Sequence, residues 1–440
     1  MMTTTPRFHV PARLAFAAFG FVFLAGSAGA QLPSASTAAL GLGDSYTAAA
    51  RGFNAVAWNP AGLGLTGNQR ASATMLTVRG SNGFGPVTLR DVADYSDVVV
   101  PASVKQDWLG RISTAGGQTG VGEASATWGA FQVGRFAMQF GTASRALTDL
   151  SPGVAELVMF GNAGVDGSVG DLDLSGSSLA AYAYSTAAAS LAQPIAFPGG
   201  RLSLGVTVKW TAGHALALGE NSVGSSTGEP LALQLDFPLV QTSLHPDSLK
   251  FDNGHGVGVD IGAGLELGRW TFAAAVQNVY NDFRWKADAL RYRPLSLSFT
   301  AGATDTDTDA RAFADAPEAV RSRMEQLGFE PVIAVGAMVR PSDRLMLTGD
   351  FRQASEDGMS TGPTMHAGGG LQYRLASWLP VRVGGALVSM GENDSGFQVG
   401  GGFGLDMGGW NLSASAARRA TNRFGDATTV MLTIFGTGID

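Results

Sequence analysis

Histidines and acidic residues are the side chains of this sequence that could bind a metal ion. The histidines beyond residue 30 are His214, His245, His255 and His366. No two of them stand at the spacing of metal ligands beside a carboxylate cluster. The acidic runs at 166–173 and 305–309 follow no known calcium-loop spacing. Cysteine is absent, which excludes thiolate metal sites and disulfides. We therefore expect solvated loops at these positions, no metal site and no cofactor.

A serine hydrolase is the second chemistry that the residue types allow. The Gly-Asp-Ser triplet at 43–45 resembles the first block of GDS-type lipases, and Asp252 and His255 have the D-x-x-H spacing of their acid and base. Serine is activated by such a pair. In those enzymes the nucleophile follows a buried apolar strand, whereas residues 34–41 are small and polar. Because the motif lacks its structural context, we expect no enzyme.

The sequence of residues 1–30 predicts a secretory signal peptide, which we assign as the first segment of the chain. Arg7 and Arg13 precede an apolar run at 14–25, which is too short to cross a bilayer as a helix, and Ala28-Gly29-Ala30 fits a cleavage site. Removing two arginines would make the formal net charge of −7 more negative. Nucleic acid is therefore not expected as a partner, and the lack of cysteine fits an oxidising envelope compartment.

Alternation with a period of two is the main signal in the rest of the chain. In 201–211 one parity is apolar and the other is polar or small: Leu202, Leu204, Val206, Val208 and Trp210 against Arg201, Ser203, Gly205, Thr207, Lys209 and Thr211. The segments 295–302, 344–351 and 410–416 repeat it. Strands of this kind suit a wall between hydrocarbon and a polar lumen. The alternative is a soluble β-sandwich whose apolar face points inward.

The positions of the tryptophans favour a membrane barrel over the sandwich. Trp270, Trp378 and Trp410 stand at strand ends beside tight turns, where an interfacial girdle would place them. We therefore predict an all-β fold, a transmembrane antiparallel β-barrel of about 14 strands. About fifteen candidate strands can be counted, although single-chain bacterial barrels close with an even number. One assignment in 281–340 must be wrong.

Connections of two lengths are expected at the two rims of such a barrel. Short turns recur near 133–134, 268–269 and 408–409, and long segments rich in Gly, Ser and Asp lie near 80–120, 146–179 and 215–255. Residues 315–328 could form a helix capped by Asp315, with Val320, Met324 and Leu327 on one face. Such a helix would pack in the lumen or on the periplasmic rim; the alternative is an ordered loop.

The most specific motif follows the signal peptide. The string 39–48 reads ALGLGDSYTA, and the residues after Asn54-Ala55-Val56-Ala57 are Trp58, Asn59, Pro60, Ala61, Gly62 and Leu63. Asn59 can close an Asx turn, Pro60 removes a donor and restricts its predecessor, and Gly62 frees the backbone again. A rigid turn results. It could fix a short plug against a barrel wall, or be an ordinary loop corner.

This opening resembles that of the FadL-type superfamily of outer-membrane proteins, which includes PorV-like relatives. The resemblance implies domains of 31–69 for a plug and 70–440 for the barrel, with Trp58, Asn59, Pro60, Ala61 and Gly62 as the plug motif. The sequence departs from the family pattern at 51–54, where it lacks the usual acidic pair, and at its end, where the last aromatic is Phe435.

The resemblance also implies a location and partners. It implies the bacterial outer membrane, contact with its lipid, and passive uptake of hydrophobic small molecules such as long-chain fatty acids. The alternative is a PorV-like scaffold that binds an envelope protein without transport. Arg201, Lys209, Arg344 and Arg382 are the lumen-facing cations that could meet a ligand carboxylate, although inward charges also simply solvate a lumen or pair with acids. No ligand-contact residue is assigned.

Overall fold

The computed structural model describes most of the chain beyond the expected signal peptide. Described are residues 32–161, 164–167, 171–221, 223–227, 232–243, 250–300, 303–354, 359, 363–391, 394–407, 410–421 and 425–439. The expected signal peptide, His245 and the turn at 408–409 lie outside these residues. No helix in the described part is long and apolar enough to cross a membrane.

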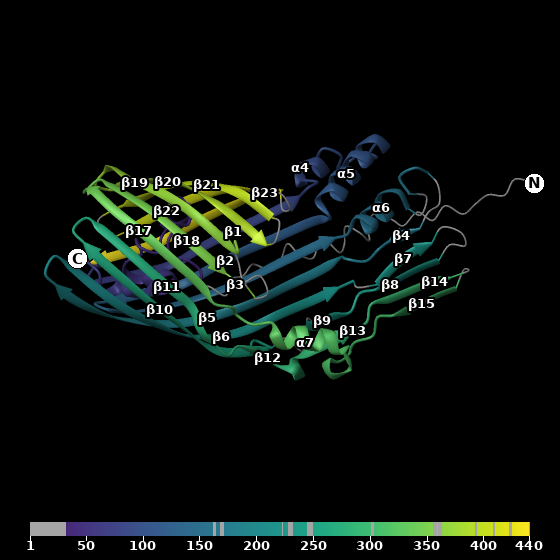
Figure 1. Cartoon of the computed structure of the whole chain (residues 1–440), viewed down its shortest axis with the longest axis horizontal. Helices are drawn as coiled ribbons and strands as arrows, with labels where there is room; N and C mark the ends of the chain where they lie inside the picture. Colours follow the sequence, from purple (N-terminus) through teal and green to yellow (C-terminus); the bar gives the residue numbers. More distant parts are fainter. Residues whose placement is uncertain are drawn as a thin grey trace, which may run out of the picture.

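The chain forms a closed antiparallel barrel of 14 strands (Figure 1). Its strands are β1 (Ala71–Gly85), β2 (Gln118–Val133), β3 (Phe136–Leu150), β5 (Ser178–Phe197), β6 (Gly200–Glu220), β10 (Gly254–Leu267), β11 (Trp270–Asn281), β17 (Val332–Ser342), β18 (Leu345–Ala354), β19 (Met365–Ala376), β20 (Leu379–Gly391), β21 (Asp394–Asp406), β22 (Asn411–Thr421) and β23 (Gly425–Ile439). Each pairs with the next, and β1 pairs with β23, from Ala71 opposite Ile439 to Gly83 opposite Ala427. The wall therefore closes on itself.

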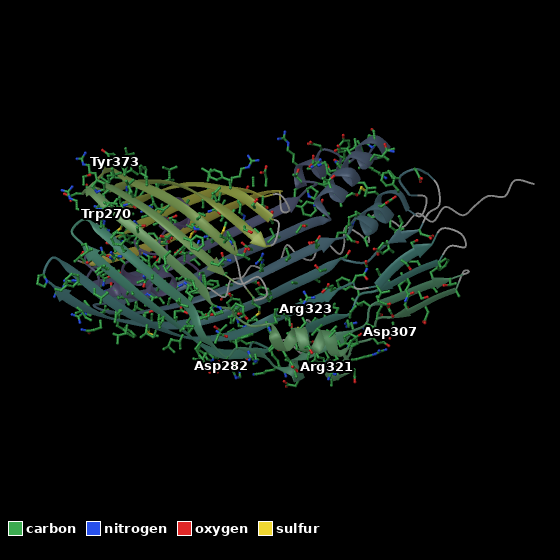
Figure 2. All side chains as sticks on the ribbon, viewed as in Figure 1. Trp270, Asp282, Asp307, Arg321, Arg323 and Tyr373 are labelled. Carbon is green, nitrogen blue, oxygen red and sulfur yellow. The ribbon has the colours of Figure 1, made fainter. Side chains whose placement is uncertain are left out.

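The expected alternation is present in these strands. In β6, Leu204, Val206, Val208 and Trp210 are exposed, whereas Ser203, Thr207, Lys209 and Thr211 are buried. Trp270, Trp378 and Trp410 are about half exposed on the outer face, and Figure 2 places Trp270 at the end of the barrel where the short turns lie. The outer surface is thus an apolar belt with an aromatic rim, and the polar parity points into the lumen.

The segment 295–302 is not a barrel strand, which corrects one prediction. Its alternating residues form β14 (Ser296–Thr300), which pairs with β8 (Ala232–Asp236) and β15 (Ala303–Asp307). Together with β7 (Val223–Thr227) and β4 (Leu172–Asp173), these strands make a separate five-stranded sheet. Five residues are too few to cross a bilayer as a strand. This removes the extra strand and leaves an even number.

Long connections lie at one end of the barrel and short turns at the other (Figure 1). The long ones contain α4 (Leu89–Ala93), α5 (Ala102–Ala115), α6 (Pro152–Phe160), β4, β7 and β8. They fall in the three segments that the sequence predicts, whereas a fourth long connection, 282–331 between β11 and β17, is not among the predicted ones. Tight turns at the opposite end carry Gly134 and Gly268 with φ of 59° and 60°, values that glycine adopts without strain.

The helix expected at 315–328 is present and shorter, as α7 (Glu318–Gln326). Its N-cap is Pro317, not Asp315, which lies in the preceding 3-10 turn. Met324 is buried, and Val320 and Leu327 pack beside it against a cluster that includes Tyr184 of β5. Figure 1 places α7 at the end with the long connections, so the expected place at the short-turn rim is wrong.

Candidate functional site

Residues 32–69, here called the plug, lie inside the barrel. They contain α2 (Ala38–Gly41), η2 (Gly52–Asn54), α3 (Ala55–Trp58) and η3 (Pro60–Gly64). Every residue in 37–50 and 55–65 is buried. Helical pieces of three to five residues cannot bury themselves, so the surrounding wall must cover them. The conformation of the plug and its position inside the barrel therefore depend on its contacts with the wall.

Asn59 joins the plug to two neighbouring strands. Its Oδ1 accepts a hydrogen bond from the amide of Ala61 at 3.0 Å, which closes a turn and caps η3. Its Nδ2 donates to the carbonyl oxygens of Ala263 on β10, at 3.1 Å, and of Ala274 on β11, at 3.3 Å. One side chain thus shapes the turn and ties it to the wall.

Trp58 anchors the other side of the same turn. Its indole Nε1 donates to Ser34 Oγ at 3.2 Å, and its ring packs edge-on against Tyr46 with centroids 5.7 Å apart. The guanidinium carbon of Arg352, on β18, lies 4.8 Å from the ring centroid. A cation over an indole face is attracted by the ring quadrupole. Trp58 therefore links the plug to a charged side chain of the lumen.

Inward glycines make the room that the plug occupies. A Cβ at Gly262 would lie 2.0 Å from Asn59 Oδ1, and one at Gly205 would lie 2.3 Å from the amide nitrogen of Ala61. A Cβ at Gly384 would lie 2.2 Å from the carbonyl carbon of Leu42. Any side chain at these positions would collide with plug atoms, which belong to the Asn59 side chain at Gly262 and to the backbone at Gly205 and Gly384. Part of the high glycine content is therefore explained by the plug, whose atoms occupy the space that wall side chains would fill.

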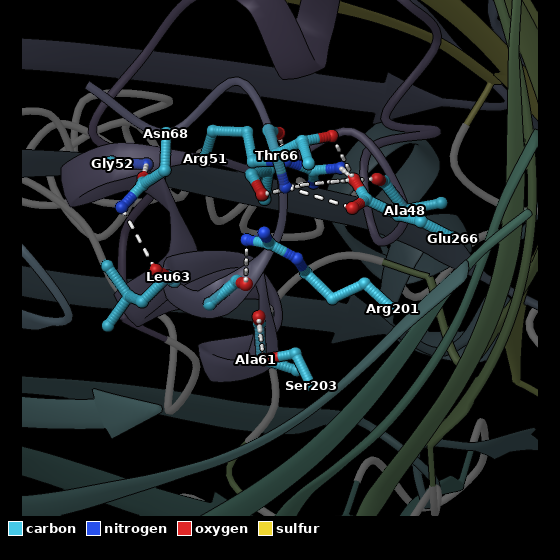
Figure 3. Close-up of polar contacts among 12 residues, drawn as sticks. Ala48, Arg51, Gly52, Ala61, Leu63, Thr66, Asn68, Arg201, Ser203 and Glu266 are labelled. Atoms are coloured by element: carbon cyan, nitrogen blue, oxygen red, sulfur yellow. Dashed lines mark hydrogen bonds and ion pairs between the residues drawn. The ribbon is translucent and has the colours of Figure 1, made fainter. Parts of the chain in front are cut away.

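Wall carboxylates hold plug amides. Asp350 Oδ2 on β18 accepts from the amides of Tyr46 and Thr47 at 2.8 and 2.7 Å. Glu266 on β10 accepts from the amide and hydroxyl of Thr66, at 3.0 and 2.8 Å, and pairs with Arg51 at 3.3 Å (Figure 3). Hydrogen bonds to charged groups are among the stronger ones. These two acids fix the middle and the end of the plug.

Wall side chains also donate hydrogen bonds to carbonyl oxygens of the plug. Ser203 donates to the carbonyl oxygen of Ala61 at 2.7 Å, and Arg201 donates to that of Gly64 at 3.3 Å (Figure 3). Further wall donors reach other plug carbonyls: Thr77 to Ala35, Gln277 to Ala57 and Ser415 to Thr37. Water can replace each of these hydrogen bonds, so the plug is attached by exchangeable polar contacts as well as by packing.

Asp44 carries the plug's buried charge. It accepts from both terminal nitrogens of Arg79, at 3.0 and 3.2 Å, and from Gln398 at 3.0 Å. Burial favours the protonated carboxyl, but the charge and hydrogen bonds of Arg79 outweigh burial and hold the pKa of Asp44 below its usual range. Asp44 is therefore a fixed anion of the plug, held by wall side chains.

A cavity of about 100 Å³ remains beside Trp58. Trp58, Asp44 and Ala57 of the plug face it, and Arg79, Glu123 and Arg352 of the wall line it. The lining mixes charged and apolar groups, so it is not the purely apolar cavity that would suit a hydrocarbon alone. An engineered cavity of about 150 Å³ binds benzene, so this one accepts only a small group while the plug is in place.

The four cations expected in the lumen differ in their locations and contacts. Arg201 and Arg382 contact the plug, since Arg201 binds Gly64 and a Cβ at Gly41 would touch Arg382 Cβ at 3.1 Å. Lys209 is buried and paired with Asp260 at 2.5 Å. Arg344 is not in the lumen: it is exposed in the turn before β18, because the alternating strand begins one residue later.

The described residues form neither a serine hydrolase site around Ser45 nor a metal site. The hydroxyl of Ser45 is buried and has no hydrogen-bond partner among the described residues. Asp252 and His255 contact each other at 3.2 Å in an exposed loop. In the same part of the chain, no three histidine, aspartate or glutamate side chains gather as metal ligands would. Asp307 of the second acidic run pairs with Arg311.

Several wall residues that hold the plug were not singled out by the sequence. Asp350, Glu266 and Arg352 are the main ones, and each lies about 200 residues or more from its plug partner. The signal available was the polar parity of β10 and β18, which shows that a side chain points inward but not what it meets.

Comparisons with known proteins bear on the fold. No family model and no curated protein matches the chain. Among solved structures, the toluene transporter TbuX of Ralstonia pickettii aligns with a TM-score of 0.53 at 14% identity, over 92% of this chain and 98% of that one. The chain has the same fold as this toluene transporter.

Two further structures align with this chain over nearly their whole length. The monoaromatic hydrocarbon channel CymD covers 95% of this chain and 98% of its own, with a TM-score of 0.50 and 11% identity. A FadL homologue of Pseudomonas aeruginosa covers 93% and 99%, with a TM-score of 0.49 and 13% identity. At such identities the likeness of TbuX and CymD establishes the architecture, and no residue role follows from it.

Proposed function

We propose that this chain is a bacterial outer-membrane barrel for passive uptake of hydrophobic small molecules, opened by movement of the plug, and not an enzyme. The observation that carries the proposal is the attachment of the plug: wall side chains bond to its backbone, and Asn59 of the plug bonds to wall carbonyls, by hydrogen bonds that water can replace. The apolar outer belt suits a bilayer. The fold it shares with a toluene transporter and a monoaromatic hydrocarbon channel supports the same reading.

An engineered disulfide tests whether the plug must move. A Cβ at Gly41 would lie 3.0 Å from Ser415 Oγ, close to the separation of about 3 Å between a Cβ and the distant sulfur of a disulfide. The described chain has no free cysteine to interfere. Gly41→Cys with Ser415→Cys should therefore lock the plug to β22 under oxidising conditions.

The readout is uptake of toluene and of oleate by cells that produce the barrel and lack another such transporter. Uptake should fall in the oxidised double variant and return on reduction, whereas each single variant should take up both compounds as the unchanged protein does. Unchanged uptake in the oxidised double variant would rule out plug movement. No uptake by the unchanged protein would instead favour a scaffold that binds an envelope partner.

A further inference from the structure

Three short strands extend the wall of the barrel at the end with the long connections (Figure 1). They follow the last part of β6 in the order β9 (Leu239–Thr242), β13 (Leu290–Arg293) and β16 (Arg311–Ala312). One face of this extension is buried and contains Leu218, Val240 and Tyr292. That face points inward, because the same cluster includes Tyr184, which shares a side of β5 with Ala188 beside the plug.

The opposite face of the extension continues the outer surface of the barrel and carries arginines. Arg291 lies opposite Gln241 on one side and Ala312 on the other, so these three side chains share the outer face. Arg293, two positions along the same strand, shares it too. These residues and Arg311 line a cavity of about 580 Å³. Three guanidinium groups therefore border one cavity outside the lumen.

Only one of these three positive charges has an acidic partner among the described residues. Arg311 pairs with Asp307, which Figure 2 places in this projecting end of the molecule. Arg291 and Arg293 donate only to backbone carbonyl oxygens, at distances from 2.8 to 3.2 Å. The Nε of Arg293 is buried and has no hydrogen-bond partner in the same part of the chain. The cavity therefore carries two uncompensated charges and an unused buried donor.

We propose that this cavity binds a phosphate monoester on a sugar-sized carrier, with Arg291 and Arg293 as its cationic partners. A phosphate monoester has a charge of about −1.5 to −2 at pH 7 and three strong acceptor oxygens, so it can neutralise both guanidinium groups. A carboxylate has a single charge and would leave one arginine uncompensated. The volume of about 580 Å³ leaves room for a carrier and lies in the usual range of small-molecule sites.

Two sources can supply such a group to the proposed outer-membrane barrel. Trp210 of β6 belongs to the apolar outer belt, and Ala217, further along the same strand, lies opposite Gln241 at the arginine face. A phosphorylated lipid headgroup can therefore approach the cavity from the membrane side, and a soluble sugar phosphate can approach from the water. The chemistry recognised is the same in both cases. The inference goes beyond the proposed uptake function and does not depend on it.

The test compares glucose 6-phosphate with glucose 6-sulfate, which have the same carrier and differ in charge at neutral pH. Binding to the purified full-length barrel in non-ionic detergent is measured by calorimetry at pH 7.5 and pH 5. The variants are Arg291→Gln and, as a matched control, Arg284→Gln. Arg284 is an exposed arginine of the same long connection that also donates to a backbone carbonyl oxygen, at 2.9 Å, and does not line the cavity.

We expect the unchanged barrel to bind the phosphate at least tenfold more tightly than the sulfate at pH 7.5. This preference should shrink at pH 5, because a phosphate monoester takes up its second proton near pH 6. Arg291→Gln should lower the affinity for glucose 6-phosphate at least tenfold and remove the preference, whereas Arg284→Gln should change neither by more than twofold. Equal binding of the two ligands to the unchanged barrel, or an undiminished preference in Arg291→Gln, would overturn the site.

If Arg291→Gln does not fold, the comparison of the two ligands at the two pH values on the unchanged barrel decides. A second measurement identifies the source of the phosphate. The unchanged barrel is placed in phosphatidylcholine nanodiscs that contain phosphatidic acid, a phosphate monoester, or phosphatidylglycerol, a diester. Weaker binding of glucose 6-phosphate in the phosphatidic acid discs would assign the site to a lipid headgroup, and equal binding in both would assign it to a soluble sugar phosphate.

Discussion

The side-chain nitrogen Nδ2 of Asn59 lies 3.1 Å from the carbonyl oxygen of Ala263, a residue 204 positions further along the chain. This hydrogen bond fastens the sharpest turn of the plug to the middle of β10. Because the same side chain also caps η3 through Ala61, the shape of the turn and its attachment to the wall depend on one residue.

Replacing that residue should loosen the plug. Asn59→Ala removes the cap and both wall bonds, which are worth roughly 1 kcal/mol each. We expect higher ion conductance of single barrels in planar bilayers and faster hydrogen exchange at Ala61. Asn82→Ala, at an exposed asparagine of β1, is the control. Conductance equal to that of the unchanged barrel would mean that the turn is secured by packing alone.

Asp350 should control a different stretch of the plug. Asp350→Ala deletes the acceptor of two amides, and hydrogen bonds to a charged group contribute about 1.5–3 kcal/mol each. Exchange of the Tyr46 and Thr47 amides should therefore accelerate by about tenfold or more. Asp350→Asn keeps a neutral acceptor, so its exchange rates at these two amides should lie between those of the unchanged protein and of Asp350→Ala. Asp343→Ala, in the exposed turn before β18, should leave both amides protected; acceleration there as well would point to a general loosening.

Gly262 should tolerate no side chain while the plug is seated. Gly262→Ala places a Cβ 2.0 Å from Asn59 Oδ1, and overpacking of this kind costs typically about 1–3 kcal/mol. We expect a lower thermal unfolding temperature together with an open plug in conductance traces. Gly122→Ala, where a Cβ meets nothing within 4 Å, is the matched control. A fully stable, closed Gly262→Ala barrel would show that the plug is not seated as described.

Lys209 and Asp260 should behave as a buried pair. Their side chains are 3% and 4% exposed, and Asp260 also accepts from the amide of Asn278 at 2.7 Å. Lys209→Met leaves a buried carboxylate without its cation and should cost about 3–5 kcal/mol in the free energy of unfolding. Adding Asp260→Asn should recover part of this loss, and Lys250→Met, at an exposed lysine, should cost little. Equal losses for the single and double variants would contradict the pairing.

Acid should release the first helical loop. The hydrogen bond from Arg111 lowers the pKa of Asp91 from 3.8 to about 2, and the bonds from Thr88 act in the same direction. Because the folded pKa is depressed, this stabilisation is present above pH 4 and is lost as the pH falls toward 2. Protease sensitivity of α4 and α5 should rise over that range. In Asp91→Asn it should be high at neutral pH and change little with acid; an unaltered profile would exclude Asp91 as the cause.

The alternation in 201–211 predicted the strands of the wall, because a strand between lipid and a polar lumen alternates residue by residue, and the tryptophans at strand ends were needed to favour a barrel over a sandwich. The same alternation in β14 misled, since period two reports the backbone conformation and not the sheet to which a strand belongs. Pairing of β14 with β8 depends on contacts about 60 residues apart, which no local pattern encodes.

The candidate site was predictable only from the plug's side. Asn59 and Pro60 form a recognisable turn, because their side chains act on their own backbone. Asp350, Glu266 and Arg352 act on residues that lie hundreds of positions away, so their sequence neighbourhood shows only that they point inward. The role of Gly262 and Gly384 was hidden for the same reason: a glycine shows that room was needed, not what fills it.

β6 is the longest of the described barrel strands. Its 21 residues extend about 70 Å along the strand at roughly 3.3 Å per residue, whereas a tilted strand needs only about 9–11 residues to cross the hydrocarbon layer. In the proposed outer-membrane barrel, about half of β6 and a similar share of β5 must therefore project beyond the bilayer into water. This projecting part carries α7 and the five-stranded sheet. A hydrophobic solute would contact this projecting part of the protein before it reached the lipid, and would bind there first.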